Sequence, residues 1–186
     1  MKRLFDIIIS VLLLLTLFLP MVLIFIAIKA TSEGKAIYWS ERVGKNNLNF
    51  QMPKFRTMRI NSPEVASHLL ENAHNFYTPL GLILRKYSLD ELPQLITILL
   101  GHMSFVGPRP SLYNQYDLIT LRNQKEVSKL KPGITGWAQV NGRDELSILE
   151  KVQYDEEYLM RASMSFDIYI IWLTIIKVIK KDGVSH

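Results

Sequence analysis

The chain has 186 residues, which is enough for one domain with a substantial buried core. It contains no cysteine, so disulfide bonds and thiol catalysis are excluded. Its 22 lysines and arginines outnumber its 17 acids and give a formal net charge of +5, with 48% hydrophobic residues. This balance suits anionic partners such as phosphates, nucleic acid or an anionic lipid surface.

The first predicted element is an apolar helix over residues 4–28, whose only polar side chains are Asp6, Ser10 and Thr16. A straight helix of this length is about 37 Å long, enough to cross the roughly 30 Å hydrocarbon core of a membrane. Pro20 lies inside the run and would remove one backbone hydrogen bond. Basic residues flank both ends, so two topologies remain open: a spanning helix, or a re-entrant hairpin broken at Pro20.

The rest of the chain predicts an α+β fold that is mostly helical. β-Branched and aromatic residues over 37–43 and 48–57, separated by a Gly-Lys-Asn-Asn turn, predict a small β-hairpin. Residues 62–78 predict a short amphipathic helix, and residues 145–162 carry a helical charge pattern.

The chain closes with a second apolar segment, residues 165–181, which ends in Lys177, Lys180 and Lys181. Its apolar part of about 14 residues is short for a membrane span. Two interpretations remain open. The segment is either an interfacial helix with lysines at the lipid headgroups, or a buried core helix with cations at its C-terminal end.

The segment Tyr87–Leu95, YSLDELPQL, places two adjacent carboxylates, Asp90 and Glu91, ahead of an apolar run. A structural interpretation exists, because Ser88 followed by Glu91 matches a capping box. Pro93 argues against that box, since it would fall inside the helix and clash with a carbonyl one turn earlier. A helix that starts at Asp90 avoids this clash and makes Asp90 itself the cap.

Arginines in rigid surroundings point to phosphate chemistry. Arg109 lies between two prolines, and Arg143 lies beside an Asn-Gly turn. Arginine forks match phosphate oxygens, and Mg²⁺ takes one or two carboxylates together with substrate phosphates. The four histidines show no metal-ligand spacing. The candidate phosphate-binding cations are Lys54, Arg56, Arg59, Arg85, Arg109 and Arg143.

Five stretches, in this order, resemble the bacterial sugar transferases, also called monotopic phosphoglycosyl transferases. They are KRLFDIIIS, KFRTM, SLDELPQL, GHMSFVGPRP and KPGITGWAQVNGR, and the resemblance covers nearly the whole chain. It implies transfer of a sugar-1-phosphate from a UDP-sugar to a polyprenol phosphate, usually undecaprenyl phosphate, with release of UMP. It also implies a minimal catalytic unit at the cytoplasmic face of the bacterial inner membrane, with a re-entrant membrane helix (1–30) and a membrane-associated catalytic domain (31–186).

The resemblance further implies roles for individual residues. Asp90 is the expected nucleophile, which forms a phosphosugar-aspartyl intermediate near an expected Mg²⁺ cofactor. Glu91 is expected to assist metal binding or to accept the proton of the lipid phosphate. The expected substrate-binding residues are Lys54, Arg56, Arg85, Arg109, Gln139, Asn141 and Arg143. The family usually has Ser-Pro at the bend where this chain has Leu19-Pro20, so Thr16 would have to replace the serine hydroxyl.

Two other functions compete with this interpretation. A membrane-anchored nucleic-acid-binding protein would use the same basic patch, but it does not need adjacent acids, and the chain has no nucleic-acid-binding motif. A structural membrane scaffold would use Asp90 and Glu91 only to cap a helix. The expected partners are therefore a UDP-sugar, undecaprenyl phosphate and membrane phospholipids, without nucleic acid, and a homo-oligomer stays open.

Overall fold

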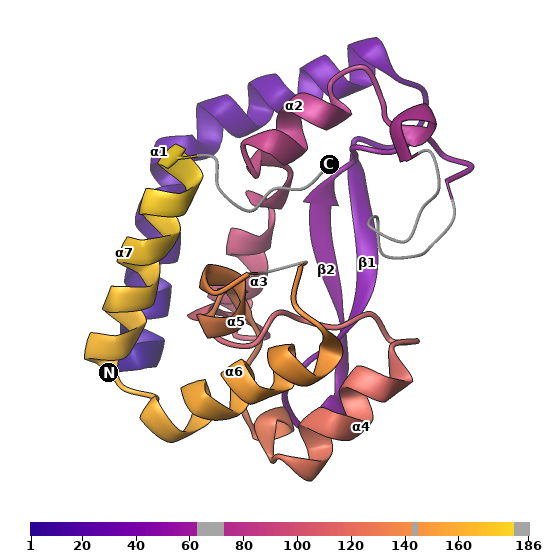
Figure 1. Ribbon diagram of the computed structural model, residues 1–186. Coiled ribbons are helices and arrows are strands. Elements are labelled where there is room, and N and C mark those ends of the chain that lie inside the picture. Colours follow the sequence, from indigo (N-terminus) through magenta and orange to yellow (C-terminus); the bar gives the residue numbers. More distant parts are fainter. Residues whose placement is uncertain (63–72, 143–144, 181–186) are drawn as a thin grey trace.

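The computed structural model describes residues 1–62, 73–142 and 145–180, which form a mostly helical protein with two small sheets (Figure 1). The predicted α+β class is confirmed. The helices are α1 (Lys2–Thr31), α2 (Gly81–Lys86), α3 (Gln94–Leu100), α4 (Tyr116–Gln124), α5 (Trp137–Val140), α6 (Ile148–Arg161) and α7 (Met164–Lys180). The strands are β1 (Ile37–Val43), β2 (Asn49–Phe55), β3 (Ser104–Val106) and β4 (Gly133–Thr135). Short 3-10 turns are η1 (Lys45–Asn47), η3 (Ala73–Phe76), η4 (Leu89–Glu91) and η5 (Val127–Lys129).

The predicted β-hairpin is confirmed as the antiparallel pair of β1 and β2, in which Tyr38 lies opposite Lys54 and Arg42 lies opposite Phe50. The turn contains Asn46 and Asn47 in the left-handed conformation, with φ of 55° and 60°. Asparagine enters this region more readily than most residues, which explains the Gly-Lys-Asn-Asn turn. The local pattern therefore predicted this hairpin correctly.

The second sheet joins two loops that are far apart in the sequence. β3 and β4 pair in parallel, with Ser104 opposite Gly133. The backbones approach so closely that a Cβ atom on Gly133 would lie 2.1 Å from the nitrogen of Gly107. The two glycines thus allow the Gly-Pro-Arg-Pro and Lys-Pro-Gly loops to pack against each other.

The helix α1 is continuous, and Pro20 lies inside it. Figure 1 shows α1 first following one edge of the molecule and then crossing the top, a change of direction that fits a proline within a helix. The Thr16 hydroxyl donates to the carbonyls of Leu12 and Leu13, at 2.9 and 3.2 Å, and not to the carbonyl that Pro20 leaves without a partner. By length and composition α1 could cross a membrane, and only 6% of its most apolar stretch is buried in the protein. The re-entrant hairpin stays a prediction.

The N-terminal end of α1 is fastened to the core by polar contacts. Lys2 Nζ donates to the carbonyl of Val106, to the Tyr158 hydroxyl and to Asp167 Oδ2, at 2.9, 2.8 and 2.5 Å. Buried Asp6 accepts hydrogen bonds from β3 through the hydroxyl of Ser104. This end of α1 is therefore part of the folded body.

The C-terminal end of α1 is fastened to the same body by Arg56, which follows β2. Arg56 Nη2 donates to the carbonyl and hydroxyl oxygens of Ser32, at 3.1 and 2.8 Å, and Nη1 donates to the carbonyl of Glu33. Ile28 of α1 is buried in a small apolar cluster with Phe55 of β2. Both ends of α1 thus contact one globular unit, and the predicted division at residue 30 stays a prediction.

The remaining helices agree with the sequence in part. The charge pattern predicted α6 correctly, and Ser147 caps it through a capping box with Glu150. The final apolar segment is α7, which buries Phe166 and Ile170 while leaving Trp172 55% exposed, so it has both a core face and an apolar exposed face. Of the helix predicted for 62–78, residues 63–72 lie outside the described residues, and η3 is the helical turn that is described.

Candidate active site

The two acids lie in the short 3-10 turn η4, between α2 and α3. Ser88 adopts the left-handed conformation, and its side chain makes no capping hydrogen bond. The helix α3 starts later, with Pro93 as its N-cap. The Ser88 capping box, against which Pro93 argued, does not form, and the predicted helix start at Asp90 is wrong, because α3 begins beyond the acids. This finding removes the observation on which the structural scaffold rested.

Both acids are buried, with 6% of Asp90 and 9% of Glu91 exposed. Glu91 Oε1 accepts from Lys54 Nζ at 2.8 Å and from Arg109 Nη2 at 3.3 Å. Lys54 comes from β2 and Arg109 from the loop after β3. Pairing of this kind offsets the free energy that a charged group loses when it is removed from water.

The electrostatics define the site as one cluster. Burial raises the pKa of Asp90, and the charge of Glu91 raises it further, whereas Lys54, Arg85 and Arg109 act in the opposite direction. Burial also lowers the pKa of Lys54, against the charges of Glu91 and Asp90. The structure thus brings together five predicted residues from four parts of the chain, and perturbed groups of this kind indicate a candidate functional site.

Arg85 is held in a fixed orientation beside the acids. Its Nε donates to the Thr57 hydroxyl at 2.9 Å, and its Nη1 donates to the Tyr77 hydroxyl at 3.3 Å. The guanidinium also lies over the Tyr77 ring, 5.1 Å from the ring centre. Such contacts limit the motion of the side chain before any substrate arrives.

The backbone of Arg109 is supported from behind by Arg122. Arg122 Nη1 donates to the Arg109 carbonyl at 2.9 Å, while its Nη2 pairs with Asp155 Oδ2 at 2.7 Å. Asp155 is almost fully buried in α6. The two prolines beside Arg109 and this buried ion pair hold the loop that presents the guanidinium.

Three other predicted residues have different surroundings. Arg56 binds the segment after α1, as described above. Gln139 Nε2 donates to the carbonyl of Ile134 at 3.4 Å, and Asn141 donates to the carbonyl of Trp137 at 2.8 Å. Arg143 lies outside the described residues.

Sequence reasoning missed Arg42 and Gln94, which line a pocket together with Lys54, Glu91 and Arg109. A signal for Arg42 was present, because side chains alternate along a strand and the register places Arg42 on the same hairpin face as Lys54. Gln94 lies three residues after Glu91, but its burial depends on the tertiary packing of α3.

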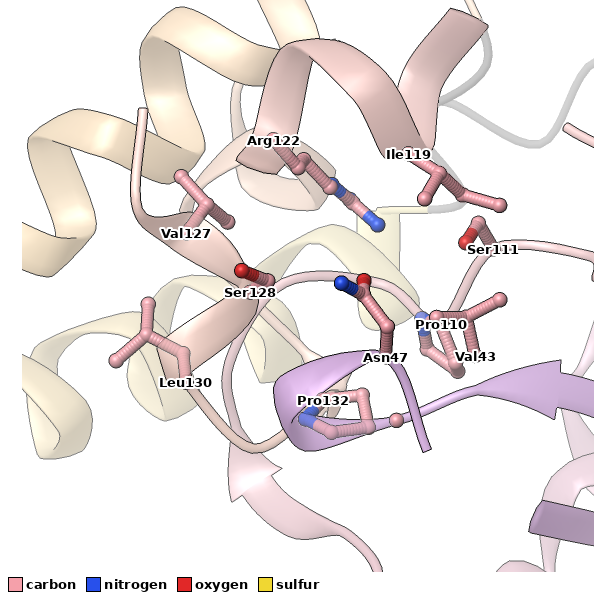
Figure 2. A pocket seen from close by; sticks show the side chains of 11 residues that line it. Val43, Asn47, Pro110, Ser111, Ile119, Arg122, Val127, Ser128, Leu130 and Pro132 are labelled. Carbon is pink, nitrogen blue, oxygen red and sulfur yellow. The ribbon is translucent and has the colours of Figure 1, made fainter. Parts of the chain in front are cut away.

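The pocket at the acids has an empty volume of about 210 Å³. A larger pocket of about 330 Å³ lies beyond Pro110, which lines both. Figure 2 shows the side chains of Arg122, Asn47 and Ser128 around it, and its described lining includes no acid. Glu91 lines the smaller pocket, and Asp90 is its neighbour in the chain but not one of the lining residues, so the candidate chemistry lies at the Glu91 side of this pocket.

The acid pair fits a magnesium ion that is completed by substrate phosphates. No group of three or more histidine or acidic side chains suited to a metal occurs in residues 1–62, 73–142 and 145–180. Mg²⁺ commonly needs only one or two carboxylates when phosphates supply further oxygens. Glu91 Oε1 is engaged by Lys54 and Arg109, whereas no described residue donates a hydrogen bond to the Asp90 carboxylate. Asp90 is thus the better ligand of the two.

The sequence was compared with known proteins. It matches the family model described as bacterial sugar transferase over residues 1–181. It is 39% identical over 185 residues to the UDP-glucose:undecaprenyl-phosphate glucose-1-phosphate transferase of Escherichia coli (strain K12), covering 95% of this chain and 40% of that protein. It is 36% identical over 187 residues to the uncharacterized sugar transferase EpsL of Bacillus subtilis (strain 168), covering 100% of this chain and 91% of that protein.

A third relative is the exopolysaccharide production protein ExoY of Rhizobium meliloti (strain 1021), 34% identical over 196 residues, with 94% of this chain and 83% of that protein covered. The chain therefore spans less than half of the E. coli relative and most of the other two. With a family model that matches almost every residue, this chain belongs to the bacterial sugar transferase family.

Proposed function

We propose that this protein transfers a sugar-1-phosphate from a UDP-sugar to undecaprenyl phosphate and releases UMP. The names of relatives support the reaction class, since the E. coli protein is named for this transfer of glucose-1-phosphate. The observation that carries the proposal is the buried pair Asp90 and Glu91, surrounded by Lys54, Arg85 and Arg109. A carboxylate with no hydrogen-bond donor among the described residues, beside three cations, suits attack on a phosphoryl group.

In the first step, an Asp90 carboxylate oxygen attacks the β-phosphorus of the UDP-sugar. A bond forms between that oxygen and phosphorus, and the bond from phosphorus to the oxygen bridging the two phosphates breaks. UMP leaves with the electron pair, so the products are UMP and a phosphosugar-aspartyl intermediate. Lys54, Arg85 and Arg109 offset the repulsion between the carboxylate and the phosphates and stabilise negative charge in the transition state.

In the second step, a phosphate oxygen of the lipid attacks the same phosphorus and displaces Asp90 as a free carboxylate. The lipid now carries the sugar as a diphosphate. A phosphate monoester is largely dianionic at neutral pH, and Glu91 accepts the proton of the monoanionic fraction. Glu91 also keeps Lys54 and Arg109 beside the reacting phosphates through its ion pairs.

The proposed cofactor is Mg²⁺, which when bound neutralises phosphate charge as a Lewis acid. Asp90 would hold it together with substrate phosphates, and Glu91 is the second carboxylate within the site. The hard oxygen donors of these two side chains are those that Mg²⁺ prefers.

We further propose that α1 enters the cytoplasmic leaflet of the bacterial inner membrane and returns to the same side. The support is that Lys2 at one end and Ser32 just after the other both bind the same globular unit. A straight spanning helix would place these ends about 45 Å apart on opposite faces. The apolar side chains exposed along α1, such as Leu15 and Phe18, suit lipid contact. This topology keeps Asp90 near the headgroups and the lipid phosphate.

The test of the reaction is intact-mass analysis of the purified protein with a panel of UDP-sugars and Mg²⁺. We expect one sugar to produce a phosphosugar adduct on the wild type before any lipid is added, with stoichiometric UMP. Undecaprenyl phosphate should then discharge the adduct. Asp90→Asn should show neither adduct nor UMP. A wild type that releases UMP only when lipid is present, without an adduct under trapping conditions, would contradict the two-step route.

A further inference from the structure

Gln94 is the first residue of α3, and it is a buried polar side chain. Only 2% of the residue is exposed, and Nε2 is buried without any hydrogen-bond acceptor in the described part of the chain. A buried donor without an acceptor destabilises the folded state, so such groups are rare and call for an explanation.

Gln94 lines the pocket beside Glu91, where cations outnumber the apolar residues Met52 and Pro110. Arg42, Lys54 and Arg109 line the same pocket, and Glu91 is the acid that lines it. Three positive charges therefore meet one negative charge, and Gln94 adds uncharged N–H donors. Donors in excess of acceptors, with a surplus of positive charge, form a position that suits an anion.

Arg42 is held so that part of its guanidinium remains available. Its Nε donates to the Ser40 hydroxyl at 2.9 Å, and its Nη1 donates to the Pro110 carbonyl at 3.3 Å. Its Nη2 makes no hydrogen bond within the described residues. Burial, together with the like charge of Arg109, lowers the pKa of Arg42 to about 10. An anion bound there would relieve this repulsion.

We propose that Arg42 and Gln94 form a second phosphate-binding position beside the one at Asp90. This inference rests on the proposed function, in which two phosphate groups must lie beside the acid pair in each step. One is bonded to, or attacked by, Asp90. The other is a phosphate monoester, either the UMP that leaves or the lipid phosphate that arrives, and the second position binds its oxygens.

The decisive variant is Gln94→Met, which keeps the side-chain length and removes the amide. The rate of adduct formation from the UDP-sugar tests whether the position binds the phosphate of UMP. The rate at which a short-chain polyprenyl phosphate discharges a preformed adduct tests whether it binds the lipid phosphate. Loss of a hydrogen bond to a charged group should slow the affected step by roughly 10-fold to 100-fold. If both steps slow, the position binds the UMP phosphate and the lipid phosphate in turn. If only one step slows, the phosphate that takes part in that step is the one that the position binds.

Stability separates binding from a structural role. Gln94→Met removes an unsatisfied donor, so its Tm should equal or exceed that of the wild type while its rates fall. The rise in Tm caused by added UMP, or by the short-chain polyprenyl phosphate, should be smaller in the variant. Gln153→Met, at an exposed glutamine of α6, is the matched control and should change neither property.

Gln94→Glu provides a second variant, since a carboxylate would repel the phosphate and should slow the same step more than methionine does. Wild-type rates in both steps for Gln94→Met, with unchanged ligand-induced Tm shifts, would overturn the proposal. A lower Tm with rates reduced only by the loss of folded protein would also overturn it. A wild type that forms no adduct would instead contradict the proposed function itself.

Discussion

Asp90 carries its charge at a cost to folding. Its pKa is raised mainly by burial, so the folded protein holds this proton at pH values where the unfolded chain has lost it. Ionised Asp90 therefore lowers the free energy of unfolding at pH values above its pKa in the folded protein. This loss disappears as the pH falls to the ordinary aspartate pKa of about 3.9. The charges of Lys54, Arg85 and Arg109 oppose this upward shift of the Asp90 pKa.

We predict that Asp90→Asn raises the Tm at neutral pH and that this gain shrinks as the pH is lowered. Asparagine keeps the shape and removes the buried charge. Thermal unfolding of both proteins without metal or substrate, from pH 8 down to about pH 4, measures the difference. A variant that is less stable at neutral pH would show that the attraction of Lys54, Arg85 and Arg109 outweighs burial.

Two arginines that look alike in the sequence should respond differently to Arg→Lys. Arg109 faces Glu91 in the pocket, and Arg109→Lys should lower kcat by about tenfold or more through loss of the bidentate fork, with little change in Tm. Arg56 holds Ser32 and Glu33, so Arg56→Lys should lower the free energy of unfolding by about 1–3 kcal/mol.

Chemical denaturation and steady-state kinetics on both variants check this contrast. Activity of Arg56→Lys should be corrected for the folded fraction. If corrected kcat falls as far as in Arg109→Lys, then Arg56 contacts the phosphates after all, as the sequence motif predicts.

At the scale of elements, the pairing of β3 with β4 positions the pocket. A Cβ added to Gly133 would lie 2.1 Å from the Gly107 nitrogen and 2.4 Å from the Thr135 carbonyl oxygen. These obstacles are backbone atoms, which cannot move aside as a side chain could. The loop that carries Arg109 therefore depends on this contact.

We predict that Gly133→Ala forces β3 and β4 apart and costs about 2 kcal/mol or more, in line with overpacked sites. Activity should fall further than stability alone explains, because Arg109 moves away from Glu91. Circular dichroism melts and adduct formation measure the two effects. Gly44→Ala is a useful comparison, since Gly44 has a negative φ of -103° and the nearest atom to an added Cβ, the Leu48 carbonyl oxygen, lies 2.9 Å away. Equal effects at the two glycines would contradict the argument from the closer backbone contact at Gly133.

At the scale of the whole molecule, one unit holds both ends of α1. Lys2 reaches Tyr158 of α6 and Asp167 of α7, and the far end reaches Arg56 beyond β2. Breaking either attachment would leave buried polar groups without partners. A topology that separates the two ends across a membrane would have to break one of them.

We predict that both ends of α1 are protected from an impermeant thiol reagent in intact cells. The chain has no native cysteine, so one cysteine inserted before Lys2, or substituted at exposed Lys35, reports each end separately. Both should react after the membrane is permeabilised. Labelling of one end only in intact cells would show that α1 spans the membrane.

The sequence by itself determined those features that depend on local pattern. The β-hairpin follows from alternation and an asparagine turn, α6 from its charge pattern, and the apolar α1 from its composition. The motifs around Asp90 and Arg109 indicated the family, which the family model matches over residues 1–181. Local periodicity and short motifs involve residues that are close in the sequence, so they can be recognised before the fold is known.

Only the tertiary structure decided what the polar side chains do. Arg56 and Arg109 are both arginines that the sequence predicts to bind phosphate. Long-range packing places Arg56 against Ser32 at the end of α1 and Arg109 against Glu91. The burial of Gln94 and the pocket it lines likewise arise where α3, β2 and the loop after β3 meet. Contacts between segments far apart in the chain set burial and the partner of each charge, and burial and partners together set the chemistry of a polar group.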